Sequence, residues 1–220
     1  MNEFLKSKTQ IIAATKALQE HGLVTHPISC KDWELFSMMY ELSGNGNFDL
    51  LDMGADGSFV LHNAMKLEGK GRRVGIDLIE VTGGNKAEGA EYFVGDLMNC
   101  PFEDNSFDMV TCASVIEHQV DFSKFAKEVN RLLRQGGNII VSFDYNPNKV
   151  DTSLTKLYSL DWNILDLNDV VYLIKCFIDE GFMITSEINW TTEDMVITPQ
   201  YCSPAQGVEY TFGILNFIKK

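Results

Sequence analysis

The sequence predicts one α/β domain built around a mostly parallel sheet, with helices on both faces of that sheet. Short apolar runs alternate with segments of helical periodicity between residues 48 and 180. The middles of these runs are almost continuously hydrophobic, as in parallel strands that are buried on both faces. The length of 220 residues suits a single domain of this class.

The first 47 residues are expected to form a helical preface. A helix is predicted over residues 8–20, where Ile11 and Leu18 belong to a repeating apolar pattern. It ends at Gly22, which can take the left-handed conformation of a helix cap. Ser29 with Asp32 resembles a capping box and predicts that a second helix follows. Residues 43–47 have turn composition and close the preface.

The strands and helices of the sheet follow in order. The predicted strands of the core span residues 48–54, 72–77, 90–96, 107–114 and 138–143, and the predicted helices span 58–67, 121–134 and 167–180. Residues 182–190 and 208–218 are predicted to be strands with no helix between them, so they should form an antiparallel hairpin at the C-terminal edge. We therefore expect a single domain with a preface (1–47), a core (48–145) and a C-terminal part (146–220).

Composition excludes several classes of partner. The net charge is -13, with 18 basic against 31 acidic residues, so binding to nucleic acid is not expected. No apolar run reaches the ~18 residues that cross a bilayer, and the N-terminus lacks the apolar core of a signal peptide. The five cysteines are dispersed and form no CxxC pair, which favours reduced thiols and a cytoplasmic location. The four histidines are also dispersed, and we expect no metal.

Candidate ligand-binding residues follow three successive strands. In an open parallel sheet, ligands bind outside the carboxyl ends of the strands. Gly54 follows the first strand, Asp77 the second, and Asp96 with Leu97 the third. Taken singly, these could be a connecting turn, a solvated loop acid and a helix cap. Together they predict a cofactor that contains a nucleoside, with Asp77 accepting the ribose hydroxyls and Asp96 the adenine amine.

The segment from residue 95 to 143 reads GDLMNCPFEDNSFD, an apolar strand, the pair Glu117-His118, a helix, and a glycine pair before another strand. This order resembles the central part of class I S-adenosylmethionine-dependent methyltransferases. LLDMGADGS (50–58) resembles the first motif of the family, and VGID (74–77) resembles the second. The resemblance covers residues 50–143 and implies a Rossmann-like sheet of seven strands, of which six are parallel and one edge strand is antiparallel.

The resemblance also implies a set of site residues. The implied cofactor is S-adenosyl-L-methionine, and the residues implied to bind it are Gly54, Ala55, Asp77, Leu78, Asp96, Leu97 and Ala113. One departure from the family motif is that Asp56 stands where the second glycine belongs. Either the loop is one residue shorter, or Asp56 takes a strained backbone conformation, which Asp tolerates better than most residues.

The expected reaction is methyl transfer to a small molecule by in-line displacement. A hydroxyl acceptor needs a general base, for which His118 is the first candidate and Glu117 the second, although His118 could serve only in packing. Three elements lie outside the shared core and should recognise the acceptor: the preface, especially residues 26–33, and residues 145–162 and 191–207. They contain or adjoin five aromatic residues suited to an apolar or sugar surface, or simply to packing: Tyr145, Tyr158, Trp162, Trp190 and Tyr201.

The acceptor and the oligomeric state stay open at this point. A sugar or another precursor of a secondary metabolite is the leading expectation for the acceptor, and a homodimer is possible in principle. A second hypothesis is a protein that binds S-adenosylmethionine without catalysis, which the altered glycine motif motivates. A third is a nicotinamide-dependent oxidoreductase, but the sequence lacks GxGxxG and a Tyr-x-x-x-Lys pair.

Overall fold

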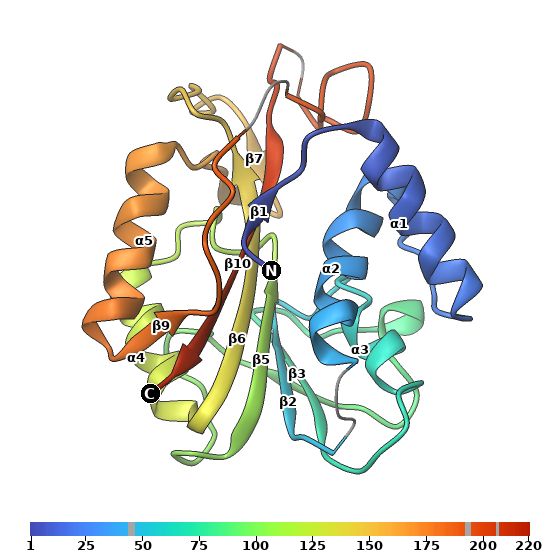
Figure 1. The fold of residues 1–220 in the computed structure, drawn as a ribbon, viewed down its shortest axis with the longest axis vertical. Coiled ribbons are helices and arrows are strands. Elements are labelled where there is room, and N and C mark those ends of the chain that lie inside the picture. The colour runs from blue at the N-terminus through green and yellow to red at the C-terminus, as the bar shows by residue number, and fades with distance from the viewer. Residues whose placement is uncertain (44–46, 192–194, 206) are drawn as a thin grey trace.

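A mixed sheet forms the centre of the molecule. The computed structural model describes residues 1–43, 47–191, 195–205 and 207–220, so most of the turn expected at 43–47 lies outside the described residues. Within them, eight strands form one sheet in the order β1-β10-β6-β5-β2-β3-β4, with β9 also paired to β10 (Figure 1). The strands are β1 (Glu3–Phe4), β2 (Leu50–Met53), β3 (Arg73–Asp77), β4 (Glu91–Val94), β5 (Phe107–Ala113), β6 (Leu133–Tyr145), β9 (Phe182–Ile184) and β10 (Thr211–Lys219).

The pairing follows the predicted pattern. Strands β4, β3, β2, β5 and β6 pair in parallel, and β10 pairs antiparallel with both β6 and β9. The predicted hairpin at the C-terminal edge is therefore confirmed. The strand expected over 182–190 is shorter than predicted and ends at Ile184. The N-terminal strand β1, which was not predicted, pairs with β10 beyond that point.

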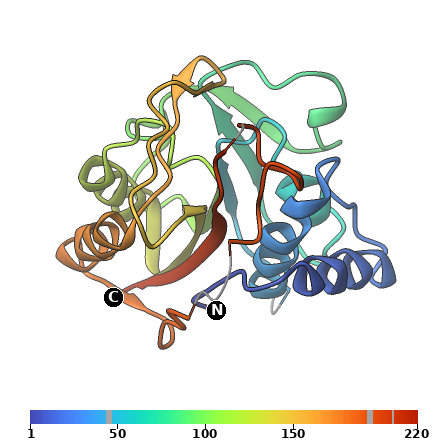
Figure 2. The ribbon, with the colours of Figure 1, turned by 90° about the horizontal axis from the view of Figure 1, so that it is seen from above.

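Helices cover both faces of the sheet. Helices α1 (Lys8–Glu20), α2 (Asp32–Leu42) and α3 (Val60–Ala64) lie on one face, and α4 (Phe122–Leu132) and α5 (Leu167–Asp179) lie on the other, as Figures 1 and 2 show. Each layer buries an apolar cluster against the sheet, with Trp33 and Met38 on the α2 side and Phe125 and Phe177 on the α4 side. A short hairpin, β7 (Lys156–Leu157) and β8 (Leu160–Asp161), stands apart from the sheet. None of the described helices is long and apolar enough to cross a bilayer.

Several other local predictions differ from the structure. The strand expected over 138–143 is longer, since β6 spans Leu133–Tyr145, and it begins where the helix expected over 121–134 has already ended at Leu132. The helix expected over 58–67 begins only at Val60, because Phe59 before it is in the left-handed region with φ +62°. The capping box expected from Ser29 and Asp32 is wrong, since residues 29–31 form a 3-10 turn. The Asp32 carboxylate instead accepts hydrogen bonds from the His26 N–H at 2.6 Å and from the Thr15 hydroxyl at 2.7 Å. It therefore joins α1, the following loop and α2.

Candidate functional site

The predicted ligand-binding residues lie along one rim of the sheet. Because β2 to β6 run parallel, their carboxyl ends meet at the same edge. Gly54 follows β2, Asp77 ends β3 and Ala113 ends β5. The N–H groups of Gly54 and Ala55 both donate to the carbonyl of Ile76, at 2.8 and 3.1 Å. The turn after β2 is thereby held against the end of β3.

Gly54 has a backbone that no other residue could adopt without strain. Its φ is +77°, in the left-handed region. A Cβ at this position would lie 2.2 Å from the Cγ2 of Val115, which follows β5. The glycine therefore allows the turn after β2 to approach the segment after β5 closely.

The altered glycine motif is accommodated without strain at Asp56. The left-handed conformation falls on Gly57, with φ +74°, so the hypothesis of a strained Asp56 is wrong. The Asp56 N–H donates to the Asp77 carboxylate at 3.0 Å, and the Asp56 carboxylate accepts from the Asn85 amide at 2.8 Å. Ser58 donates its hydroxyl to Asp52. Asp56 thus cross-links the loops that follow β2 and β3.

Asp52 is a fully buried carboxyl beneath this loop. It accepts hydrogen bonds from the hydroxyls of Ser58 and Thr111, the latter at 2.7 Å. Burial raises the pKa of Asp52 to about 7, helped by the nearby charge of Asp77 and opposed by the two hydroxyls. The folded protein therefore retains a proton that the unfolded chain has already released.

This proton makes a testable contribution to stability. Between the ordinary pKa of 3.8 and about 7, the free energy of unfolding should fall as pH rises, because the folded state binds more protons in that window. One proton corresponds to a slope of about 1.4 kcal/mol per pH unit. In Asp52→Asn the slope between pH 4.5 and 6.5 should be shallower than in the wild type by up to that amount. Urea denaturation across this range would measure it, and an unchanged slope would contradict the assignment.

The side of the rim next to β4 combines a carboxylate with exposed apolar side chains. Each oxygen of Asp77 accepts one backbone N–H, from Asp56 at 3.0 Å and from Ile79 at 3.2 Å. Leu78 and Ile79 are 57% and 56% exposed. Asp96 is exposed, and its carboxylate accepts only the Met98 N–H, at 2.8 Å, among the bonds of the described residues. Leu97 differs from its neighbours in being buried in the apolar cluster below.

The preface contacts the glycine loop directly. The Nε2 atom of His26 lies 2.8 Å from the carbonyl of Gly57, and its ring meets Phe59 edge-on at 5.1 Å. Burial lowers the pKa of His26 below its ordinary value, so the ring is neutral near pH 7. The sequence placed residues 26–33 near the acceptor but gave no sign of this contact with the loop after β2.

A buried charged cluster lies beside the ends of β5 and β6, and we call it the Lys31 cluster. It comprises Lys31, Glu34, Ser114, Glu117, Ser142 and Asp144. The ammonium of Lys31 lies 2.6 Å from the Ser114 hydroxyl, 3.1 Å from Glu34 and 4.0 Å from Asp144. The hydroxyls of Ser114 and Ser142 each donate to the same oxygen of Glu34 at 2.5 Å. Ser114 itself has φ +51°, so these bonds hold a strained backbone at the end of β5.

The charges in this cluster do not balance. Burial alone would lower the pKa of Lys31, but Glu34, Asp144 and Glu117 more than offset it and hold that pKa above its ordinary value. Burial, with like charges nearby, raises the pKa of Asp144 to about 6 and that of Glu117 well above its ordinary value. Glu117 is 1% exposed, and its Oε2 has no hydrogen-bond partner in the described part of the chain.

The two candidate bases therefore have different environments. Glu117 is fully buried and close enough to Lys31, Glu34 and Asp144 for their charges to affect its pKa. His118 is half-buried and meets Tyr158 edge-on at 5.7 Å. Burial lowers the pKa of His118, and its Nδ1 has no hydrogen-bond partner among the described residues. His118 is thus neutral near pH 7, and its Nδ1 is a buried atom without a hydrogen-bond partner in the described part of the chain.

The aromatic residues predicted to recognise the acceptor divide into two groups. Tyr145 and Trp162 are buried and pack in the interior, where the Trp162 indole donates to Asp144 at 2.8 Å. Tyr158 is 79% exposed and Trp190 is 40% exposed. Part of the loop predicted over 191–207 lies outside the described residues.

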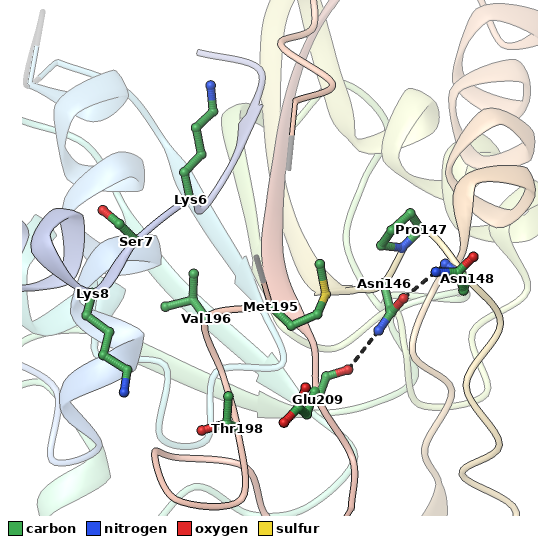
Figure 3. Close-up of a pocket in the computed structure, with 10 residues that line it drawn as sticks. All are labelled: Lys6, Ser7, Lys8, Asn146, Pro147, Asn148, Met195, Val196, Thr198 and Glu209. Carbon is green, nitrogen blue, oxygen red and sulfur yellow. Dashed lines mark hydrogen bonds between the residues drawn. The ribbon is translucent and has the colours of Figure 1, made fainter. Parts of the chain in front are cut away.

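A cavity of about 660 Å³ opens farther along the same rim (Figure 3). It lies beyond the carboxyl end of β6, and none of the predicted cofactor-binding residues lines it. The Asn146 amide donates to the Glu209 carbonyl across one wall at 2.9 Å, and the Lys8 ammonium stands 4.5 Å from the ring of Tyr201 nearby. The lining residues are Lys6, Ser7, Lys8, Asn146, Pro147, Asn148, Met195, Val196, Thr198 and Glu209. This cavity belongs to the elements predicted to lie on the acceptor side.

These features define an α/β protein of the Rossmann-like class, in which the predicted site residues gather at the carboxyl ends of the parallel strands β2 to β6. Residues 51–141 match the family model described as a methyltransferase domain. This part of the chain is therefore similar to a methyltransferase domain, and the fold is that of S-adenosylmethionine-dependent methyltransferases of known structure.

Individual relatives agree with this family. The ubiquinone/menaquinone biosynthesis C-methyltransferase of Roseobacter denitrificans is 30% identical over 135 residues, which cover 57% of this chain and 54% of that protein. A demethylmenaquinone methyltransferase of Staphylococcus epidermidis is 32% identical over 112 residues, covering 48% of this chain and 46% of the relative. The chain thus spans about half the length of these two curated relatives.

Solved structures share the fold. The S-adenosylmethionine-dependent methyltransferase of Mesorhizobium loti superimposes with a TM-score of 0.60 at 15% identity, covering 86% of this chain and 98% of that one. At this identity the likeness is one of architecture.

Proposed function

We propose that the protein transfers a methyl group from S-adenosylmethionine to a small-molecule acceptor. The observation that carries this proposal is the pairing of two features at one rim. The Gly54 turn and the Asp77 carboxylate stand at the ends of β2 and β3, and the Lys31 cluster stands beside the ends of β5 and β6. A donor subsite and an acceptor subsite would then adjoin where the strands end. The relatives named for menaquinone biosynthesis support an acceptor that is a small molecule.

The residues present fit the cofactor in their chemistry. The space that a Cβ on Gly54 would fill is already occupied by Val115, so the turn offers bare backbone. Each oxygen of Asp77 accepts one N–H and keeps a lone pair for a ribose hydroxyl. Leu78 and Asp96 are exposed at the neighbouring strand ends, where an adenine would lie. The residues that we propose to hold the cofactor are Gly54, Ala55, Asp77, Leu78, Asp96, Leu97 and Ala113.

The work of the chain in this reaction is mainly positioning. The bound cofactor supplies a methyl group on a positively charged sulfur, which is already activated toward displacement. The residues of the preface would cover the donor side through His26 and the acceptor side through Lys31, and so exclude water. His118, which is neutral near pH 7, is the proposed proton acceptor during transfer. Tyr158 beside it would give a sugar or another metabolite a flat exposed surface.

Asp77→Ala should weaken the binding of S-adenosylhomocysteine by about 1–3 kcal/mol, or roughly 5- to 150-fold in Kd, because it removes hydrogen bonds to a charged acceptor. Isothermal titration calorimetry would measure this change. Glu80→Gln, at an exposed acid three residues further on, is the matched control and should bind as the wild type does. Equal affinity in wild type and Asp77→Ala would remove Asp77 from the site.

Transfer itself needs a separate assay. Protein incubated with methyl-labelled S-adenosylmethionine and a small-molecule extract should move label into a metabolite fraction. Binding of S-adenosylhomocysteine without any transfer would favour the non-catalytic hypothesis. Saturable heat with NAD and none with S-adenosylhomocysteine would favour the oxidoreductase instead.

A further inference from the structure

The Lys31 cluster holds more negative than positive charge. Its three carboxylates, Glu34, Glu117 and Asp144, are each at most 4% exposed. Lys31 is the cation paired with them, and it contacts only Glu34 closely, at 3.1 Å, while Asp144 is at 4.0 Å. Fully ionised, the cluster would carry a net charge of -2. Buried carboxylates normally need a cation or a hydrogen-bond donor for each charge.

Three carboxylate oxygens of the cluster are buried and accept no hydrogen bond within the described residues: Glu34 Oε2, Glu117 Oε2 and Asp144 Oδ1. Glu34 Oε2 pairs with the Lys31 ammonium at 3.1 Å, so the other two mark where further donors are missing. Their neighbours have already been used, since the Trp162 indole donates to the other oxygen of Asp144 and both serine hydroxyls donate to Glu34. Native structures rarely leave buried acceptors without a partner. A ligand that brings N–H donors and positive charge would supply what these oxygens lack.

We infer that the Lys31 cluster is a subsite for an ammonium group, and that the methyl acceptor of this protein is therefore an amine. That the bound amine is a methyl acceptor rests on the proposed function. The cation subsite itself is argued only from the geometry of the cluster. In the free chain the ammonium of Lys31 occupies the subsite. The acceptor's ammonium would bind beside it, or displace it, and donate to Glu117 and Asp144. For transfer, the ammonium would first give one proton to a carboxylate of the cluster. The nitrogen lone pair would then form the bond to the methyl carbon as the carbon–sulfur bond breaks and the sulfur leaves as a neutral thioether.

The surroundings favour an organic ammonium over other ligands. The ring of Phe212 lies 4.3 Å from the Lys31 ammonium and provides a face for a cation. The described residues contain no group of three or more His, Cys, Asp or Glu side chains placed to hold a metal ion. A neutral hydroxyl could donate one hydrogen bond here, but it would leave the excess charge uncompensated. An ammonium supplies several donors and the missing charge together.

The cation subsite can be tested through stability, without any methyl transfer. Lys31→Ala removes three methylenes and the ammonium, a volume that n-propylammonium would fill. We expect n-propylammonium chloride to raise the melting temperature of Lys31→Ala by several degrees more than equal concentrations of 1-propanol or sodium chloride. Lys16→Ala, at a side chain that is 74% exposed, should show no such difference. Equal effects of the amine and the alcohol on Lys31→Ala would overturn the subsite.

The two unpartnered oxygens can be tested in the same background. Adding Glu117→Gln or Asp144→Asn to Lys31→Ala should raise the concentration of n-propylammonium needed for half of the effect by at least tenfold. Glu68→Gln, at an exposed acid of the loop after α3, should leave that concentration unchanged. If both cluster substitutions behave like Glu68→Gln, Glu117 and Asp144 do not bind the cation.

The acceptor class is tested on the unmodified chain. With methyl-labelled S-adenosylmethionine, a panel of small amines should be labelled at least ten times faster than the alcohols of the same carbon skeleton. Labelling of the alcohols at equal or higher rates, or labelling of no amine in the panel, would overturn the amine inference. Binding of S-adenosylhomocysteine, measured in parallel, reports separately on the proposed methyltransferase function.

Discussion

Lys31→Met should lower the free energy of unfolding by about 3–5 kcal/mol, as expected when one partner of a buried ion pair is removed. Methionine retains most of the volume of the lysine stem, so the loss would come from the charge and its hydrogen bonds. The substitution leaves Glu34 without its 3.1 Å ion pair and Ser114 without the 2.6 Å bond from the ammonium. It also removes the only lysine or arginine that forms an ion pair with these carboxylates in the described residues.

The loss should depend on pH in a defined direction. Lys31 lowers the pKa of both Glu117 and Asp144, so without it these two buried carboxyls retain protons more strongly in the folded state, and the deficit should grow as pH rises from 5 to 8. Urea denaturation at several pH values would measure both effects. Lys16→Met is the control, because the exposed pair of Lys16 with Glu20 should contribute at most about 0.5 kcal/mol. A deficit for Lys31→Met no larger than that of Lys16→Met would show that the cluster does not depend on this charge.

A suppressor provides a second check. Asp144→Asn removes one of the uncompensated charges while keeping a side chain that can accept from the Trp162 indole. In the double variant Lys31→Met/Asp144→Asn, part of the lost free energy should return, because the two changes act on the same cluster. Strict additivity of the two single changes would argue against a direct interaction across 4.0 Å.

The central sheet was predictable because its signals are local. Strands such as β5 are continuous apolar runs, and α4 carries its apolar residues on one face, so periodicity alone locates them. The end of α1 was predictable for the same reason: Gly22 has φ +67° there and the Leu23 N–H returns to the carbonyl of Leu18. The two-residue strand β1 carries no such signal. It is a strand only because β10, more than 200 residues away, presents an edge to it.

The Lys31 cluster was missed because its partners are distant in the chain. Glu34 binds Ser114 and Ser142, which are 80 and 108 residues away. A lysine and a glutamate three residues apart at the start of a helix would ordinarily lie in water and pair with each other. One signal was present in the sequence. Apolar residues surround Glu34 in α2, so this helix has almost no polar face to expose, and the structure buries it between α1 and the sheet.

The loop after β2 shows a second reason why a structural detail could not be predicted from the sequence. The sequence indicated that Asp56 departs from the family motif, but two explanations remained open. The structure assigns the left-handed conformation to Gly57, and Asp56 uses both its N–H and its carboxylate to join neighbouring loops. Which residue of a short loop takes a positive φ depends on these long-range hydrogen bonds, and spacing alone does not specify them.

Gly54→Ala should lower the free energy of unfolding strongly, for two reasons that can be separated. The first reason is backbone strain, since alanine at φ +77° costs about 1–2 kcal/mol. The second is steric, because the new Cβ would lie 2.2 Å from Val115 and must push apart the turn after β2 and the segment after β5. Overpacking of this kind costs typically about 1–3 kcal/mol more.

Gly57→Ala supplies the matched control. Gly57 lies in the same loop with φ +74°, but a Cβ there would meet nothing within 4 Å. It should therefore show the cost of the backbone conformation alone, and the difference between the two variants should measure the contact with Val115. Adding Val115→Ala to Gly54→Ala should recover part of that difference. Because the same contact positions the end of β5, Gly54→Ala should also weaken S-adenosylhomocysteine binding more than Gly57→Ala does. Equal losses of stability in the two variants would mean that the close approach at Gly54 does not constrain the rim.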